Sequence, residues 1–446
     1  HTKSICSSWG NFNYKTFDGV IYQFPGTCNY NLASHCESSY HEFSVHIQRS
    51  IEDGSPVIHQ IFIQVKDVPI ELKRDAQKVN GEIFKTPYFN YGVFINKKDG
   101  YTKVTTKIGL TLTWNQEDSV MLEVDSKYNN KMCGLCGDYN GIEVHNEFYL
   151  NDMPLNPIQF GNMQNINDPT ITCTNVDESQ QMNVSSCGQY YSVCKSYLSQ
   201  SAFSSCQDLL DVSDYVMACM LDVCSCSSAD ISCLCSTLTE YSRQCTHAGG
   251  IPQNWRTDDL CPKHCPGNMV YKESGSPCIS SCSHRVVKSL CEEHDVDGCF
   301  CPDGTVWDDY NNAGCISTSE CYCKYQDQLY APGSKILNDC EACTCESGLW
   351  SCIQTPCYGT CTIYGSGHYI TFDKKFYDFD GSCEFVIAQD YCEDSASNGT
   401  FRIITENIPC GTTGVTCSKS IKIYLGVSIA LLYCSGTYHL CQIFLA

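Results

Sequence analysis

The sequence predicts a multidomain, mainly β protein in which disulfide-rich modules follow a β-sandwich domain. Three features of the chain support this fold class. Residues 1–172 alternate like strands and hold few cysteines, the stretch up to residue 360 is dense in cysteine, and the opening segment recurs after it. We therefore expect a β-sandwich, then a small disulfide-rich helical module, small disulfide-rich β modules, and a truncated second copy of the sandwich.

Composition indicates an oxidising compartment and excludes several classes of partner. Cysteine accounts for 37 of 446 residues, and 28 basic against 50 acidic residues give a net charge of −22. So many thiols are typical of a disulfide scaffold, which predicts a secreted, extracellular protein. An acidic chain is a poor partner for nucleic acid. The uncharged stretch 423–446 is interrupted by polar residues, so we expect no membrane span.

Residues 1–172 are expected to form the β-sandwich domain. Alternation of apolar and polar residues predicts strands at 43–48, 60–65, 103–107 and 110–114. Turn signals stand at Asn80-Gly81 and Asp99-Gly100. Short antiparallel strands of this kind bury one face each, which a sandwich satisfies.

The following regions are predicted to depend on cross-links. Residues 173–260 combine frequent cysteines with apolar residues spaced by three and four, which indicates short helices. Residues 261–322 and 323–360 contain little apolar material, so disulfides must replace a hydrophobic core there.

Residues 361–446 repeat the beginning of the chain. The segment from Thr371 to Cys383 matches the segment from Thr16 to Cys28 at an offset of 355 residues. The same offset places the counterpart of Cys133 at position 488, so we expect the second sandwich to be incomplete. An incomplete domain also accounts for the odd number of cysteines, which leaves at least one without a partner.

These segments resemble a known modular family. The likeness is carried by the stretches KTFDGVIYQFPGTCNY (15–30), CGLCGDYNG (133–141), EYSRQCTHAGG (240–250) and CPDGTVWDD (301–309). They resemble the amino-terminal D assembly of secreted gel-forming mucins, which is similar to that of von Willebrand factor. The resemblance implies a von Willebrand type D domain (1–172), an eight-cysteine module (173–260), a trypsin-inhibitor-like module (261–322), an E module (323–360) and an incomplete second type D domain (361–446).

A short loop after Cys136 is a candidate calcium site. Calcium prefers six to eight carboxylate, amide and carbonyl oxygens, although the same residue types also form solvated turns. The resemblance adds Asp18, because related D domains supply an aspartate from the equivalent segment. The candidate oxygens within the loop itself come from Asp138, Asn140, Ile142, Asn146 and Glu147.

The pair Cys133 and Cys136 has the spacing of a thiol–disulfide exchange centre. The resemblance associates this motif with disulfide rearrangement during multimer assembly. The alternative interpretation is two ordinary structural half-cystines.

Histidines suggest a second metal and a response to pH. His247 and His294 are candidates for a copper site, with Met121 or Met269 nearby, and isolated structural histidines are the alternative. Protonation of all 12 histidines would move the net charge from −22 to −10 and weaken self-repulsion. We therefore expect acid and calcium to favour self-association.

No catalytic motif stands out in the chain, so we do not expect an enzyme. The sequons at Asn183 and Asn398 predict N-glycosylation.

The resemblance implies a structural module of a secreted gel-forming mucin. It would support calcium- and pH-dependent packing and disulfide-linked polymerisation of a homo-oligomer stored in secretory granules, with calcium, and secondarily copper, as bound metals. The alternatives are an extracellular adhesion or matrix glycoprotein built from the same modules, and thiol–disulfide exchange at the Cys-x-x-Cys motif.

Overall fold

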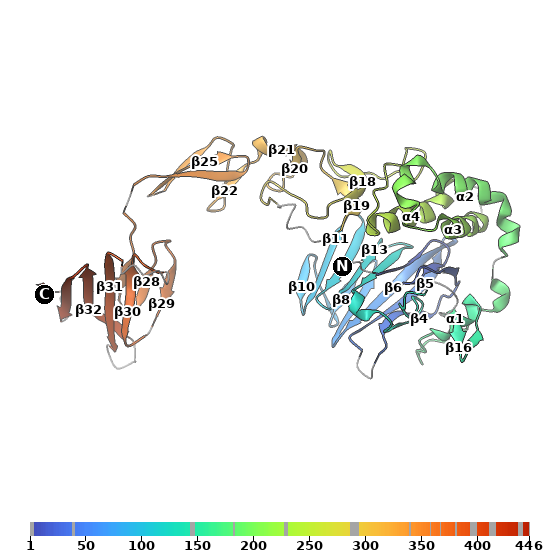
Figure 1. Ribbon diagram of the computed structural model, residues 1–446, viewed down its shortest axis with the longest axis horizontal. Coiled ribbons are helices and arrows are strands. Elements are labelled where there is room, and N and C mark those ends of the chain that lie inside the picture. Colours follow the sequence, from blue (N-terminus) through green and yellow to red (C-terminus); the bar gives the residue numbers. More distant parts are fainter. Residues whose placement is uncertain are drawn as a thin grey trace. The chain divides into compact units, whose positions relative to one another are not determined.

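In the computed structural model the chain forms two compact units, residues 1–332 and 333–446, each of which is described by itself. Figure 1 follows the chain through both units. The structure describes residues 4–37, 41–142, 148–181, 183–226, 231–285, 294–338, 340–356, 358–365, 367–379, 381–392, 399–409, 416–435 and 440–445.

Two antiparallel sheets of the first unit form the predicted β-sandwich (Figure 1). The first sheet runs, in spatial order, through β10 (Tyr88–Asn90), β11 (Val93–Lys98), β12 (Tyr101–Thr106), β13 (Leu110–Trp114), β14 (Val120–Val124), β1 (Ser4–Trp9), β2 (Asn13–Lys15) and β3 (Ile21–Gln23). The second sheet runs through β15 (Met132–Cys133), β4 (Asn29–His35), β5 (Phe43–Glu52), β6 (Ser55–Val65), β7 (Val68–Lys73), β8 (Gln77–Val79) and β9 (Glu82–Ile83).

Apolar side chains from both sheets share one core. Val45 and Ile47 of β5 point into it together with Leu112 of β13 and Leu122 of β14, and all four are 0–1% exposed. The alternation that predicted strands at 43–48, 60–65, 103–107 and 110–114 is confirmed by β5, β6, β12 and β13. Period-two alternation identified these strands because every second residue of each one faces the shared core.

The two predicted turn signals are hairpin turns. Asn80 and Gly81 join β8 to β9, and Asp99 and Gly100 join β11 to β12. All four residues have φ between 52° and 82°, the left-handed conformation that two-residue hairpins favour.

Three disulfides and several short elements complete the sandwich domain. The bridges in the described part of this domain are Cys6–Cys136, Cys28–Cys173 and Cys36–Cys133. They close loops of 97 to 145 residues, which restricts the unfolded chain strongly. The short elements are η1 (Ser126–Tyr128), β16 (Tyr149–Leu150), β17 (Met153–Pro154) and α1 (Pro157–Met163).

The predicted helical module is confirmed. Asp211 caps the longest of its helices by accepting a hydrogen bond from the backbone N–H of Ser213 at 2.9 Å. The helices are η2 (Glu178–Gln180), η3 (Val184–Tyr190), α2 (Tyr191–Leu198), η4 (Ser201–Cys206), α3 (Val212–Ser225), η5 (Ile231–Leu234) and α4 (Cys235–His247). They are cross-linked by Cys187–Cys224, Cys194–Cys219, Cys206–Cys245, Cys226–Cys233 and Cys235–Cys261.

A chain of buried hydrogen bonds joins this module to the sandwich. Trp9 Nε1 donates to Thr237 Oγ1 at 3.0 Å, and the Thr237 hydroxyl donates to Asp222 Oδ2 at 2.9 Å. Asn13 Nδ2 donates to the other carboxylate oxygen of Asp222 at 2.8 Å. A Cβ on Gly10 would lie 2.5 Å from Asp222, and φ there is +56°, so this close approach requires glycine. We call these residues the Asp222 interface.

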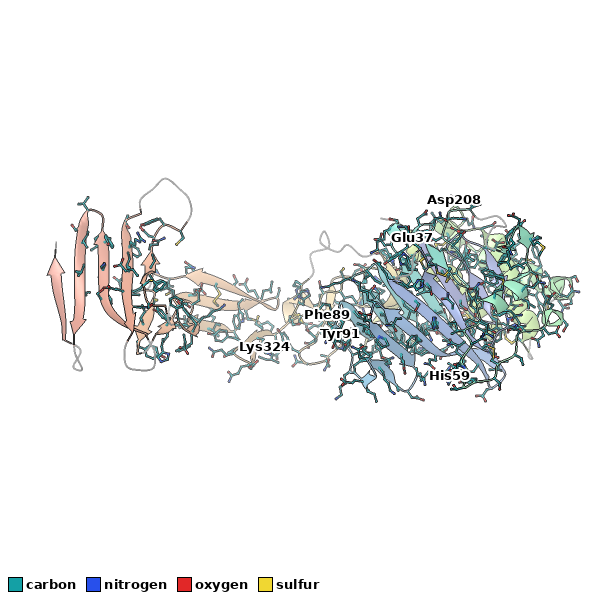
Figure 2. The ribbon with its side chains drawn as sticks, turned by 90° about the horizontal axis from the view of Figure 1, so that it is seen from below. Glu37, His59, Phe89, Tyr91, Asp208 and Lys324 are labelled. Atoms are coloured by element: carbon teal, nitrogen blue, oxygen red, sulfur yellow. A yellow bond between two sulfur atoms is a disulfide. The ribbon has the colours of Figure 1, made fainter. Side chains whose placement is uncertain are left out.

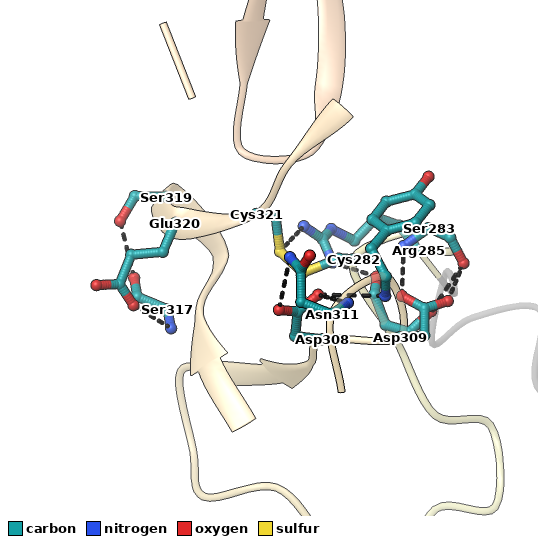
Figure 3. Close-up of a disulfide and its surroundings, with 12 residues drawn as sticks. Cys282, Ser283, Arg285, Asp308, Asp309, Asn311, Ser317, Ser319, Glu320 and Cys321 are labelled. Atoms are coloured by element: carbon teal, nitrogen blue, oxygen red, sulfur yellow. Dashed lines mark hydrogen bonds between the residues drawn. A yellow bond between two sulfur atoms is a disulfide. The ribbon is translucent and has the colours of Figure 1, made fainter. Parts of the chain in front are cut away.

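The next module has almost no apolar core, as predicted. Its buried cluster consists of Cys282, Val306 and Cys321, and Arg285 donates to the Cys321 sulfur at 3.4 Å (Figure 3). Its elements are β18 (Val270–Gly275), β19 (Val296–Phe300), β20 (Thr305–Trp307), β21 (Cys315–Ser317) and η7 (Thr318–Glu320). The described bridges are Cys265–Cys299, Cys282–Cys321 and Cys301–Cys315. The hairpin of β22 (Cys323–Tyr325) and β23 (Gln328–Tyr330) follows in the first unit.

The second unit is made of three small antiparallel sheets (Figure 1). Its strands are β24 (Lys335–Asn338), β25 (Glu341–Glu346), β26 (Leu349–Gln354), β27 (Thr362–Tyr364), β28 (His368–Ile370), β29 (Phe376–Asp378), β30 (Glu384–Gln389), β31 (Phe401–Pro409), β32 (Thr416–Leu425), β33 (Ser428–Ser435) and β34 (Leu440–Leu445). Within the uncharged stretch after Ile423, β33 and β34 are strands, and no described helix has the length and apolarity needed to cross a membrane.

Cys361, Cys383 and Cys392 of this unit are free thiols. Cys361 and Cys383 match Cys6 and Cys28 at the repeat offset of 355, and the partners of those two residues in the first copy would map to positions 491 and 528.

Candidate functional site

The turn between β2 and β3 brings Asp18 next to the loop that follows Cys136. The backbone N–H of Phe17 donates to the Cys136 carbonyl at 3.0 Å, and the Cys6–Cys136 disulfide joins the same loop to β1. Two segments 120 residues apart in the sequence are therefore held together before any ligand is considered.

Within this site, backbone groups of the loop face the Asp18 carboxylate. The N–H groups of Asn140 and Gly141 donate to Asp18 at 3.1 and 2.8 Å. Asn140 donates from Nδ2 to Asp138 Oδ2 at 2.9 Å and accepts the N–H of Ile142 at Oδ1 at 2.8 Å. The structure thus brings together four of the predicted calcium residues, namely Asp18, Asp138, Asn140 and Ile142. The other two, Asn146 and Glu147, lie outside the described residues.

The electrostatics of Asp18 and Asp138 favour a bound cation. Asp138 Oδ1 is buried and has no hydrogen-bond partner within the described structure. Burial and the adjacent Asp18 carboxylate raise the pKa of Asp138 above its ordinary value. A divalent ion would relieve this repulsion and fill the coordination of the orphaned oxygen, so the donor set fits calcium.

A second cluster joins the three modules of the first unit. His247 at the end of α4 contacts Glu123 of β14 through Nδ1, and His294, just before β19, contacts the same Glu123 oxygen through Nε2 at 2.9 Å. The two imidazole rings lie 4.3 Å apart between centroids, and the three ligand atoms lie within 4.8 Å of one another. We call these residues the Glu123 cluster.

The electrostatics of the Glu123 cluster suit a metal ion that is bound by imidazole nitrogen and carboxylate oxygen. Burial opposes ionisation of Glu123, but the two histidines hold its pKa well below the ordinary range. The hydrogen bond that the His294 ring donates to Glu123 raises the pKa of His294 against the opposing effect of burial. A buried carboxylate with two imidazoles offers the nitrogen and oxygen ligands of a copper(II) site.

The structure brings the two predicted copper residues together. His247 and His294 do come together, whereas the two other histidines of the cross-linked modules, His264 and His284, are exposed. Glu123 was not predicted, although it stands two residues after the predicted Met121. The signal available in the sequence was one acidic residue inside an otherwise apolar, fully buried strand.

The Cys-x-x-Cys cysteines belong to two different bridges. Cys133 pairs with Cys36 beside β4, and Cys136 pairs with Cys6 of β1. In this structure both cysteines are disulfide-bonded, one toward each sheet of the sandwich. Thiol exchange would require one of these bridges to open first.

One of the two predicted glycosylation sites can be located. Asn183 is exposed at the start of η3, and its side chain accepts the backbone N–H of Ser185 at 3.0 Å. Asn398 lies outside the described residues.

Comparison with known proteins identifies the modules that carry these sites. Family models match residues 6–153 and 361–434 (von Willebrand factor type D domain), 193–262 (C8 domain) and 265–321 (Trypsin Inhibitor like cysteine rich domain). Mucin-2 of Homo sapiens is 47% identical over 424 residues, which cover 94% of this chain and 8% of that protein.

Two further relatives extend the comparison. Mucin-5AC of Homo sapiens is 43% identical over 448 residues, covering 100% of this chain and 8% of that protein. Mucin-6 of Gallus gallus is 34% identical over 428 residues, covering 94% of this chain and 35% of that protein. The chain therefore spans less than a tenth of the length of the two human relatives.

Proposed function

Since the chain carries the von Willebrand factor type D, C8 and trypsin-inhibitor-like domains of a gel-forming mucin D assembly, we propose that it supports calcium- and pH-dependent assembly of mucus. The module itself is structural and belongs to a non-enzymatic family whose relatives are secreted. In the proposed function it self-associates, packs mucin chains in secretory granules and orders them for disulfide-linked polymerisation.

One observation supports the calcium part of the proposal. The carboxylates of Asp18 and Asp138 lie next to each other on segments that the Cys6–Cys136 disulfide helps to hold together, and one Asp138 oxygen is buried without a hydrogen-bond partner in the described structure. Asp18, Asp138 and Asn140 would supply side-chain oxygens, and Ile142, Asn146 and Glu147 would complete the set. Calcium would supply positive charge that ties the loop to the β2–β3 turn. It would also reduce the net negative charge through which copies repel one another.

Calcium titration of the full chain tests this site. Asp18→Asn removes one carboxylate, so we expect calcium affinity to fall at least about tenfold, measured by isothermal titration calorimetry. Asp373→Asn is the matched control, because Asp373 is the exposed repeat counterpart of Asp18. Equal calcium binding by Asp18→Asn and the unaltered chain would refute the site.

The pH part of the proposal rests on charge. The net charge of −22 falls in magnitude as the 12 histidines become protonated, so acid favours association of like-charged copies. Light scattering of the full chain between pH 5 and 7.5, with and without a chelator, measures this response. We expect larger particles at low pH with calcium present, and a flat profile would contradict the proposal.

The Glu123 cluster supports copper as the second metal. Copper(II) added to the full chain is expected to give an electron paramagnetic resonance spectrum with nitrogen coupling from the two imidazoles. His294→Gln should weaken copper binding, whereas His264→Gln, which alters an exposed histidine, should not. If His294→Gln gives the same spectrum and the same copper affinity as the unaltered chain, the Glu123 cluster is not the copper site.

A further inference from the structure

A cavity on the second sheet lies apart from both metal centres. It has a volume of about 190 Å³ and lies beside the Cys28–Cys173 disulfide. Its floor is the outward face of β4, β5 and β6, and its wall is the segment that follows α1.

Strand register places two kinds of side chain in adjacent rows on this floor. Gln48 of β5 stands opposite Gln60 of β6 and Asn29 of β4, which makes a row of amides. The neighbouring rung pairs His46 with Phe62, whose rings lie 5.8 Å apart at 33°. The floor therefore offers an amide row next to an aromatic surface.

The amides have unused hydrogen-bonding capacity. In the described part of the chain, the side chains of Asn29, Gln48, Gln60 and Asn167 make no hydrogen bond to other protein groups, and all four line the cavity. Each amide offers two N–H donors and one carbonyl acceptor. A ligand with several hydroxyl groups, each both donor and acceptor, matches such a surface.

The charges around the cavity favour a neutral ligand. No Lys or Arg is among the described residues that line it. The one carboxylate, Asp168, already accepts the backbone N–H and the hydroxyl of Thr170 at 2.8 and 2.6 Å. Burial lowers the pKa of His46, so its ring is uncharged at neutral pH and serves as an apolar surface with Phe62.

We propose that this cavity binds one neutral pyranose unit, a hexose or N-acetylhexosamine. Its hydroxyls would bond to the amide row, and its apolar ring face would lie on Phe62. The cavity is smaller than the roughly 300–1,000 Å³ of pockets for drug-sized ligands, which suits one sugar ring. The sugar comes either from a glycan of this chain or from a glycan of another molecule.

Ligand-observed NMR titrations of the full chain test the cavity. The probes are methyl β-N-acetylglucosaminide, methyl β-galactoside and, as the anionic comparison, N-acetylneuraminic acid. We expect a neutral glycoside to bind in the millimolar range, and Gln60→Ala and Phe62→Ala each to weaken it about five- to tenfold. Gln64→Ala is the matched control, because its amide lies on the same strand face and donates to the Lys66 carbonyl at 2.9 Å.

Three results would overturn the proposal: no neutral glycoside binds either before or after treatment of the chain with a glycosidase, only the anionic sugar binds, or Gln60→Ala and Phe62→Ala bind as Gln64→Ala does. Asn167→Ala, in the exposed wall of the cavity, repeats the test if the strand variants unfold. Treatment with a glycosidase separates the two sources. Binding that emerges only after treatment identifies the chain's own glycan as occupant, and equal binding before and after identifies an external one.

Discussion

Replacing Asp222 by Asn is expected to remove much of the pH dependence of the contact between the sandwich and the helical module. Burial raises the pKa of Asp222 to about 7, and nearby Asp118 adds to the shift. Hydrogen bonds from Asn13, Thr237 and the backbone of Asn11 oppose it without cancelling it. Asn fills the same space and keeps an acceptor toward Asn13, but it does not titrate.

The magnitude follows from proton linkage. The folded state binds the Asp222 proton more tightly than the unfolded state, whose pKa is 3.8, so stability rises as pH falls from above 7 toward 3.8. Between pH 7.5 and pH 5.5 the difference is about 2 kcal/mol, or about 25-fold in an opening equilibrium. Asp222 therefore stabilises the contact at low pH, which is the same direction as the proposed acid-favoured self-association.

Hydrogen exchange of α3 in the full chain measures this effect directly. After correction for intrinsic exchange, protection of residues 212–225 should be about 25-fold greater at pH 5.5 than at pH 7.5. In Asp222→Asn the ratio should be less than about threefold. Asp208→Asn, on the surface of the same module, is the control for the change in net charge (Figure 2). If Asp222→Asn keeps the pH dependence of the unaltered chain, the reasoning is wrong.

Gly134→Ala should abolish secretion, because its Cβ would lie 2.7 Å from the Leu32 carbonyl at a φ of +115°; normal secretion would contradict this. Alkylation without reductant should label Cys361, Cys383 and Cys392 but not the Cys-x-x-Cys pair, and labelling of that pair would instead favour thiol exchange. Calcium at about 100 times its dissociation constant should stabilise the chain by about 2.7 kcal/mol, so an unchanged melting temperature after chelation would argue against the site.

Much of the fold could be predicted because its signals are local. A strand such as β5 alternates over its length because one face is buried and the other is not, and Asn80-Gly81 adopts a turn that few other pairs allow. The scarcity of apolar residues near Cys282 and Cys321 likewise required cross-links in place of a core.

The sites were only partly predictable. His247 and His294 were candidates because histidine is a common metal ligand, but Glu123 sits among apolar strand residues and gave no comparable signal. The partners of Cys133 and Cys136 also had no local signal, since spacing alone permits pairing with each other or with distant cysteines.

The sequence by itself determined the fold class, the order of modules, the dependence on oxidised cysteines and the recurrence of the first domain. Those properties reside in composition, periodicity and repetition, which are read within short windows. Only the tertiary structure decided that Glu123 lies with His247 and His294, which cysteines pair, and that unpartnered amides from three strands and a loop line one cavity. The physical reason is that charge repulsion, metal ligation and cavity shape depend on distances between residues far apart in the chain, and these distances exist only after the modules have packed.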